Sequence, residues 1–409
     1  MPVPTAAGPE LRDPTVPLIA TDTGVSPLRG HLPVLDGVRG LAVLLVMAFH
    51  FGRFRAAILP DRAFQMVVES GWAGVDLFFV LSGFLITGIL FDAKGRAAYF
   101  RNFYTRRALR IFPLYYAYLI LFILVLPRVM PGAYDAIVGA QEWFWAYLSN
   151  IRVAREGWFS GPSRVGNHFW SLAVEEQFYL VWPAVVFWCG RRRLMQLCAG
   201  AFVVALAFRI GLVVFDARPA AGYVLLPARL DALAAGSFLA LAAREPGGLE
   251  RLARRAAVAG PIAALVLAGI FVWRRGLYFT DVATQTAGFS AFAIAFGALV
   301  IWLVGRPESR ASRALAHPGM RFWGKYSYAL YVVHPVAGML GGARGIVTTR
   351  LPTVFGSHIP ASLAVIAIKI AASTAIALVS WHVMEKHFIR LKDRFPYGQD
   401  RPRAAGPLP

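Results

Sequence analysis

Residues 35–50 read LDGVRGLAVLLVMAFH, an apolar run with Arg39 near its start and His50 at its end. Extended to about 20 residues, such a run is long enough to cross the hydrocarbon core of a bilayer as a helix. The spacing places the two side chains within about 20° of each other around the helix and about 16.5 Å apart along it. One helix face therefore carries a permanent cation and a titratable base. The alternative is an arginine that extends to lipid headgroups and a histidine at the opposite interface.

Similar apolar runs recur along all 409 residues, of which 57% are apolar and 16% are charged. This composition excludes a disordered chain and is typical of an integral membrane protein. We predict an all-α polytopic membrane protein with ten spans, at residues 32–51, 72–91, 111–126, 169–188, 194–215, 223–243, 256–273, 282–304, 322–340 and 361–384. Pro227, Arg229 and Asp231 interrupt the sixth span, which predicts an irregular or cavity-lining helix.

The formal net charge is +20, from 42 Lys and Arg against 22 Asp and Glu. With the N-terminus in the cytosol, the segments on that side contain about twice as many Lys and Arg as the outer loops, as the positive-inside rule describes. We therefore expect both termini in the cytosol, a disordered tail at 1–31, a ten-helix domain at 32–388 and a second tail at 389–409. Because the basic residues are divided among loops, no nucleic-acid partner is expected.

The fourth span opens with NHFWSLAVEEQFY at residues 167–179, which places two adjacent carboxylates in an apolar helix. Such groups are costly in a membrane and usually face a cavity or a partner. Glu175 and Glu176 point about 100° apart, so they are expected to do different jobs. In the functional interpretation Glu175 lines a cavity with His168 and Ser171, and Tyr179 follows on the same segment. The alternative is a structural ion pair with an arginine of a neighbouring helix.

Residues 104–113 read YTRRALRIFP and precede the third span. Arg107 and Arg110 are three residues apart and share a helical face. Guanidinium groups suit phosphate oxygens, so this pair is predicted to hold a lipid headgroup or a phosphate-rich donor. The alternative is the ordinary excess of basic residues on the cytosolic side.

The second span contains GVDLFFVLSGFL at residues 74–85. Gly83 and Ser82 permit a close approach of helices. Asp76 is costly in a membrane and is expected to face a cavity or to pair with a basic group. Further candidates for a cavity are Asp231 and His334. Cys189 and Cys198 are expected on opposite helix faces, so neither a disulfide nor a metal site is predicted.

Taken together, these segments resemble the acyltransferase 3 family of bacterial membrane-bound O-acyltransferases. The resemblance is carried by the Arg39-to-His50 spacing and by the blocks at 74–84, 107–113 and 170–179. Three later features fit as well, namely RLDALAAG at 229–236, GKYSYALYVVH at 324–334 and Glu385. The similar region runs from about residue 32 to residue 388.

The resemblance implies ten spans with both termini cytosolic. It also implies transfer of an acyl group, usually acetyl, from cytosolic acyl-CoA to a hydroxyl of an acceptor that is often an extracytoplasmic carbohydrate. His50 would act as general base or as transient acyl acceptor, and Arg39 would hold the donor or polarise its thioester. Arg107 and Arg110 would bind the donor phosphates, and Glu175 would orient His50 or hold the acceptor.

Because 24 residues follow Glu385, we expect a stand-alone form without a fused extracytoplasmic hydrolase-like domain. The expected location is the bacterial cytoplasmic (inner) membrane, and no metal cofactor is expected. Two alternatives stay open. One is the acylation of a secreted small molecule such as a macrolide. The other is a membrane transporter or flippase, which intramembrane charges and a broken sixth helix would also fit.

Overall fold

The computed structural model describes residues 28, 30–52, 56–340 and 351–397. The tail predicted at 1–31 lies almost entirely outside the described residues, and so do residues 398–409 of the second predicted tail. The helices discussed below all belong to the compact unit that begins at Leu32. Within that second tail, Lys386–Arg390 (α19) and the short helix Leu391–Arg394 continue the helical structure beyond residue 388.

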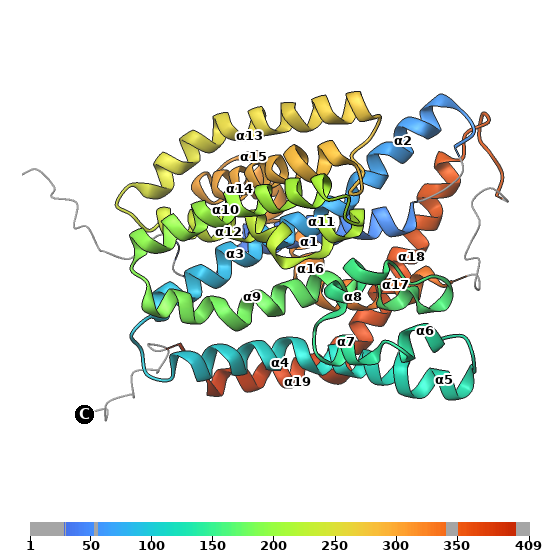
Figure 1. Ribbon diagram of the computed structural model, residues 1–409, viewed down its shortest axis with the longest axis horizontal. Coiled ribbons are helices and arrows are strands. Elements are labelled where there is room, and N and C mark those ends of the chain that lie inside the picture. Colours follow the sequence, from blue (N-terminus) through green and yellow to red (C-terminus); the bar gives the residue numbers. More distant parts are fainter. Residues whose placement is uncertain (1–27, 29, 53–55, 341–350, 398–409) are drawn as a thin grey trace, which may run out of the picture. The chain divides into compact units, whose positions relative to one another are not determined.

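The regular elements of the described residues are helices (Figure 1). The ten helices that correspond to the ten predicted spans are α1 (Pro33–Phe51), α3 (Gly74–Ala93), α4 (Tyr99–Leu119), α9 (Phe169–Trp188), α10 (Arg191–Val214), α12 (Leu226–Ala242), α13 (Gly248–Arg274), α14 (Phe289–Gly305), α17 (Ser327–Gly338) and α18 (Ile359–Ser380). The shorter helices are α2 (Leu59–Glu69), α5 (Leu126–Val129), α6 (Asp135–Val138), α7 (Gln141–Trp145), α8 (Ser149–Glu156), α11 (Pro219–Val224), α15 (Arg310–Leu315) and α16 (Pro318–Lys325).

Eight helical stretches of the described residues are long and apolar enough to cross a membrane, by length and composition. The predicted spans at 169–188 and 322–340 are not among them. The first contains the polar triplet Glu175-Glu176-Gln177, and the second divides at Tyr326 into α16 and α17. The total of ten spans therefore stays a prediction.

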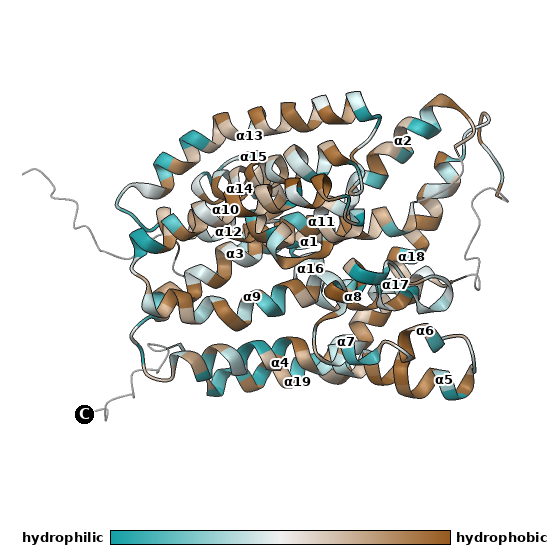
Figure 2. Cartoon of the chain, in the orientation of Figure 1, coloured by the Kyte–Doolittle hydropathy of each residue, from teal (hydrophilic) through white to brown (hydrophobic). Residues whose placement is uncertain are grey.

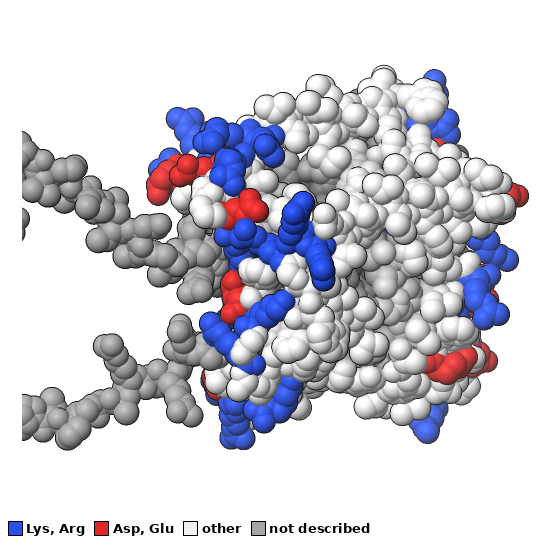
Figure 3. Space-filling model, turned by 60° about the vertical axis from the view of Figure 1, so that its left-hand side comes forward, with Lys and Arg blue, Asp and Glu red and all other residues white. Residues whose placement is uncertain are grey.

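Apolar side chains face outward along the helices at the edge of the bundle. Val203 on α10, Leu265 on α13 and Val379 on α18 are exposed, and α13 is apolar along most of its length in Figure 2. On the face drawn in Figure 3, Lys and Arg gather toward the ends of the helices and leave an uncharged band between them. These features are those of an all-α polytopic membrane protein.

Helix α12 lies at the centre of the packing and contacts α3, α10 and α14. Its contact with α3 depends on two glycines that face each other's backbones. A Cβ atom at Gly83 would collide with the carbonyl of Leu233, and one at Gly236 would collide with the carbonyl of Val80. The close approach expected at Gly83 is therefore present, and it follows the small-residue packing of membrane helices.

The sixth predicted span is irregular, as expected. Helix α11 ends at Val224, Leu225 adopts an extended conformation with ψ of 139°, and α12 begins at Leu226. Pro227 lies in the first turn of α12, where the missing N–H has no intrahelical role. The charged residues that follow this break, Arg229 and Asp231, are fully buried in the core of the bundle.

Two fully buried ion pairs cross the interior of the bundle. Arg229 of α12 pairs with Asp76 of α3, and Arg209 of α10 pairs with Asp231 of α12 at 2.8 Å. Ser290 of α14 accepts a hydrogen bond from Arg209 and donates one to Asp231. Asp76 and Asp231, which the sequence suggested as cavity candidates, are thus structural partners of arginines. Asp76 was expected to face a cavity or to pair with a basic group, and the structure shows the pairing.

The third predicted span begins twelve residues earlier than expected, because helix α4 starts at Tyr99. Arg107 and Arg110 therefore lie within the helix, and Pro113 is accommodated in its interior. Beyond α4 the chain continues as a π-helical segment at Ile120–Val125. The following segment contains helices α5 to α8. Two tyrosine hydroxyls of α4 hydrogen-bond to backbone carbonyls of this segment. Tyr115 donates to the carbonyl of Phe144 and Tyr118 to that of Val165.

The buried pair between Asp76 and Arg229 generates a stability prediction. Replacing Arg229 with Met leaves Asp76 buried without its partner, so we expect a loss of about 3–5 kcal/mol in unfolding free energy. The double variant Asp76→Leu, Arg229→Met should recover most of that loss. Thermal unfolding of the detergent-solubilised chain is the measurement. Arg274→Met breaks the exposed pair with Asp281 and is the control, with an expected cost of about 0–1 kcal/mol.

Candidate functional site

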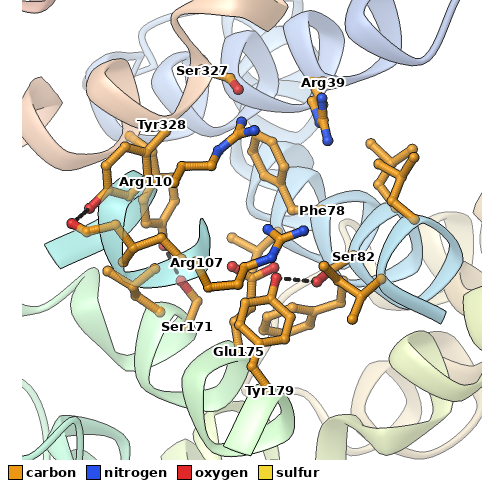
Figure 4. Close-up of a pocket in the computed structure, with 18 residues that line it drawn as sticks. Arg39, Phe78, Ser82, Arg107, Arg110, Ser171, Glu175, Tyr179, Ser327 and Tyr328 are labelled. Carbon is orange, nitrogen blue, oxygen red and sulfur yellow. Dashed lines mark hydrogen bonds between the residues drawn. The ribbon is translucent and has the colours of Figure 1, made fainter. Parts of the chain in front are cut away.

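A cavity of about 110 Å³ lies between helices α1, α3, α4, α9 and α17 (Figure 4). Its apolar wall includes Phe78 and Leu172. Its polar wall consists of Arg39, Ser82, Arg107, Arg110, Ser171, Glu175, Tyr179, Ser327, Tyr328 and Tyr331. Five segments that are far apart in the sequence thus bring three guanidinium groups, one carboxylate and several hydroxyls to one space inside the bundle.

Three arginines define one end of this cavity, which we call the arginine end. Arg107 and Arg110 come from α4, and Arg39 comes from α1. The three charges act on one another electrostatically. Arg39 donates to Asp36 at 3.3 Å, and the guanidinium of Arg107 lies 5.3 Å from the centre of the Tyr179 ring. Arginines gathered in this way favour a multiply charged anion such as a phosphate.

Glu175 is the carboxylate of the cavity, and Figure 4 shows it beside Arg107. The hydroxyls of Ser82 and Tyr179 hydrogen-bond to each other, and both reach the Glu175 carboxylate. Arg107 also acts on this carboxylate electrostatically. Glu175, Ser82 and Tyr179, all predicted site residues, are therefore brought together into one polar group beside the arginines.

Glu176 has a different environment, as the angle between the two carboxylates predicted. It lines a mainly apolar groove of about 740 Å³ between α4, α9 and residues 146–148. Arg107 and Tyr179 line both this groove and the cavity, so the two spaces are neighbours. One carboxylate of Glu175-Glu176 thus faces the cavity and the other the groove.

Lys392 was missed in the sequence, because residues after 388 were assigned to a tail. It lies close enough to Arg39, Arg107 and Arg110 for their charges to act on it. Arg106 fixes this segment by donating to the carbonyl of Lys392 at 2.8 Å and to that of Phe395 at 3.0 Å. The basic residues that follow Glu385 were the signal that could have indicated a second basic wall.

Ser171 and Tyr331 lie at the other side of the cavity and hydrogen-bond to each other. The Tyr331 hydroxyl donates to the backbone carbonyl of His168 at 2.9 Å. His168 itself does not line the cavity. Its ring lies 5.5 Å from that of Tyr331, between ring centres. Tyr331 therefore connects the cavity with the histidine beyond it.

His50, His168 and His334 meet at this second end, which we call the histidine end. The ring centres of His50 and His334 are 4.6 Å apart, and those of His334 and His168 are 5.3 Å apart. The three come from α1, from the residue before α9 and from α17. Each was a separate candidate in the sequence, and their proximity was not predicted. His50 is exposed, whereas His168 and His334 are buried.

Backbone hydrogen bonds fix the tautomers of two of these rings. The Nδ1 atom of His50 lies 2.8 Å from the carbonyl oxygen of Val46, and Nδ1 of His334 lies 2.8 Å from that of Tyr331. A carbonyl oxygen accepts and never donates, so in the neutral rings Nδ1 carries the proton and Nε2 carries the lone pair. Arg39 and His50 occupy opposite ends of α1, as their spacing requires.

Cys189 and Cys198 are free thiols in the structure. Within the described ranges, no group of His, Cys, Asp or Glu side chains is arranged to hold a metal ion. The side chains at this site are arginines, one carboxylate, hydroxyls and imidazoles. These groups can bind an anion, polarise a carbonyl oxygen and accept a proton.

A polar cavity between an arginine cluster and a histidine cluster, inside a helical bundle with an apolar surface, defines a membrane-embedded enzyme site. The family described as the acyltransferase domain matches residues 32–382. The chain belongs to this family, the acyltransferase 3 family.

The chain is similar to the peptidoglycan O-acetyltransferase OatA of Listeria monocytogenes, with 29% identity over 334 residues, which cover 75% of this chain and 49% of that protein. It is also similar to the O-acetyltransferase OatA of Staphylococcus aureus, with 28% identity over 329 residues, or 74% of this chain and 50% of that protein. The chain thus spans about half the length of these curated relatives. No solved structure matches it.

The separation of the two neighbouring carboxylates generates a prediction for acyl transfer. Glu175→Gln removes the charge that meets Ser82, Tyr179 and Arg107, and hydrogen bonds to a charged group contribute about 1.5–3 kcal/mol. We therefore expect transfer to slow by about 10- to 100-fold. Initial rates in membranes at equal protein level are the measurement. Glu176→Gln is the matched control and should keep the rate near wild type; equal losses in both variants would contradict the assignment.

Proposed function

We propose that this chain transfers an acetyl group from cytosolic acetyl-CoA to a hydroxyl of a cell-envelope carbohydrate on the other side of the bacterial cytoplasmic membrane. The observation that carries the proposal is a cavity lined by three arginines whose wall residue Tyr331 contacts a cluster of three histidines, with α1 contributing Arg39 to the first group and His50 to the second. Membership of the acyltransferase 3 family and the likeness to O-acetyltransferases support it.

The arginine end suits the donor. Acyl-CoA carries phosphates and a thioester at opposite ends of a long pantetheine arm. Arg107 and Arg110 would bind the phosphates through charge-assisted hydrogen bonds, and Lys392 would add a further positive charge. Arg39, which lines the same end, would hold the donor there as well. The same end would lie in the cytosol, in agreement with the distribution of Lys and Arg along the sequence.

The histidine end suits the proton chemistry. The lone pair on Nε2 of His50 would take the proton of the acceptor hydroxyl as its oxygen attacks the thioester carbon. A bond from the acceptor oxygen to carbon then forms, the bond from carbon to sulfur breaks, and the coenzyme leaves as a thiolate. The same lone pair is the one that would attack if His50 accepted the acyl group transiently.

The path between the two ends is narrow. The ring centres of Phe78 and Tyr331 are 6.2 Å apart, and the cavity of about 110 Å³ is smaller than the roughly 300–1,000 Å³ of usual ligand sites. The thioester end of the donor would therefore have to displace these side chains to approach His50. A site that is completed by its substrate excludes water from the reacting thioester.

Aromatic rings beside His50 suit a carbohydrate acceptor. The ring centre of Phe49 lies 4.9 Å from that of His50 and 6.5 Å from that of Phe279. Trp158 lies 6.1 Å from Phe279 and is 36% exposed. Sugar rings present flat faces of C–H groups that pack on aromatic rings, while their hydroxyls stay available for reaction. These rings would place an acceptor hydroxyl near His50.

The experiment that tests the function uses membranes supplied with labelled acetyl-CoA. Loss of the base should reduce transfer of label to carbohydrate by about 10²–10⁴-fold in His50→Ala, and Arg39→Ala should also be inactive. The control is His382→Ala, which alters an exposed histidine with the same type of backbone hydrogen bond outside the site. Equal labelling by wild type and His50→Ala at matched protein level would exclude His50 from the reaction.

The aromatic rings generate a separate prediction. Trp158→Ala removes the exposed ring, and one aromatic contact is worth about 0.5–1.5 kcal/mol. We expect the KM for an N-acetylglucosamine oligomer to rise by about 2- to 10-fold, with the KM for acetyl-CoA unchanged. Trp158→Phe should keep most of the affinity. Trp273→Ala, which removes an exposed tryptophan of α13, is the control. A rise confined to the KM for acetyl-CoA would place Trp158 with the donor instead.

A further inference from the structure

His334 occupies a position that packing alone does not explain. Its side chain is fully buried, and its Nε2 atom has no hydrogen-bond partner among the described residues. Its Nδ1 atom donates to the carbonyl of Tyr331, so the buried Nε2 is an unsatisfied lone pair. Burying an unsatisfied polar atom costs stability, typically about 1–3 kcal/mol. A phenylalanine or leucine would fill the same space without this cost.

The side chains around His334 indicate which positively charged group can interact with its Nε2 lone pair. Among ionisable side chains, His50 and His168 act on it most strongly. The ring of His168 lies near the carbonyls of Val165 and Val332, although neither ring nitrogen meets the geometry of a hydrogen bond. Lys369 donates to the backbone carbonyl of Gly338 at 3.5 Å, and its ammonium lies 5.8 Å from the ring centre of Phe51. His50 is the exposed member of the group.

We propose that His334 is a positioning residue that stabilises the imidazolium formed on His50 during acyl transfer, by presenting its Nε2 lone pair to that charge. The inference rests on the proposed function, in which His50 takes the proton of the acceptor hydroxyl. In that step the acceptor oxygen bonds to the acyl carbon, the electron pair of the C–S bond leaves with the thiolate, and the proton resides on His50. His50 then releases the proton to water at its exposed side, and the thiolate of the departing coenzyme takes a proton from water.

Many hydrolases place a carboxylate beside the catalytic histidine for this purpose. Here a neutral imidazole with a fixed tautomer takes that place. It attracts the imidazolium without adding a second buried charge, which the membrane interior would penalise. It also leaves the neutral form of His50 ready to accept a proton, because no permanent negative charge holds a proton there. His168, 5.3 Å from His334, completes the buried side of the cluster.

Two conservative variants separate the Nε2 lone pair from the rest of the His334 side chain. His334→Asn keeps a donor for the Tyr331 carbonyl at the position of Nδ1 and removes Nε2. His334→Gln places an amide group near the position of Nε2. We expect kcat to fall by about tenfold or more in His334→Asn, less than the roughly 10²–10⁴-fold for a lost base, with the KM values for acetyl-CoA and acceptor within twofold of wild type. His334→Gln should retain more activity than His334→Asn.

Chemical rescue gives a readout that a purely structural role would not move. His334→Ala opens a space the size of imidazole, and added imidazole should restore part of kcat. Pyrrole has the same size but no acceptor lone pair, so it should not restore activity. Equal rescue by both compounds would mean that His334 only fills space. This test stays informative where His334→Asn lowers the amount of folded protein.

The outcomes also distinguish this inference from the function on which it rests. If His50→Ala is inactive while His334→Asn keeps the wild-type kcat, the role of His334 is refuted and the proposed function stands. If His50→Ala retains transfer, the proposed function fails first. Amounts of protein in the membrane and unfolding temperatures are compared for every variant, with His382→Ala as the unrelated histidine control.

Discussion

A charge in the interior of a membrane has to be neutralised or hydrated by the protein, because hydrocarbon can do neither. This chain meets the constraint in two ways. Arg229 with Asp76, and Arg209 with Asp231, are fully buried pairs that tie α3, α10 and α12 together. Arg39, Arg107 and Arg110 instead surround a cavity lined by one carboxylate. The first arrangement holds the scaffold, and the second leaves positive charge available for an anionic ligand.

The two arrangements share helix α3, which makes the scaffold a condition for the site. Asp76 and Ser82 are six residues apart, or about 120° around the helix. The first faces the ion pairs of the interior and the second faces the cavity. Gly83 brings the backbone of α3 against α12 and so sets the distance between the paired charges and the cavity wall. Loss of the pair would therefore displace Ser82 and, with it, the polar group around Glu175.

The relative positions of side chains on one helix could be predicted from the sequence, whereas contacts between different helices could not. The spacing of Arg107 and Arg110, and the divergence of Glu175 from Glu176, follow from the geometry of a single α-helix. In contrast, His50, His168 and His334 belong to distant segments, and no periodicity indicates that they meet. The sequence likewise showed that Asp76 needed a partner or a cavity, but only the fold identifies the partner as Arg229.

The two predicted spans that fall short of an apolar membrane helix both supply the cavity. The polar triplet that makes α9 less apolar includes Glu175, and α9 also provides Ser171 and Tyr179. The break at Tyr326 shortens α17, which provides Ser327, Tyr328 and Tyr331. A helix that lines a polar space contains polar residues, so it lacks the continuous hydrophobicity by which membrane spans are detected in a sequence. The two predicted spans that are not apolar enough to count as membrane helices therefore both line the polar cavity.

At the histidine end one side chain, that of His50, is exposed, and the other two, those of His168 and His334, are buried. Some side-chain atoms of Asp76, Arg209 and Arg229 have no hydrogen-bond partner among the described residues. Each of these side chains nevertheless forms an ion pair through another of its atoms. Within the part of the chain that the structure describes, His168 has no hydrogen-bond partner at either ring nitrogen and His334 has none at Nε2. An acceptor outside the bundle can reach His50 because its side chain is exposed. Its neighbours His168 and His334 are buried, so in the proposed reaction the charge gained by His50 would meet fixed imidazole dipoles on that side rather than solvent that must reorganise.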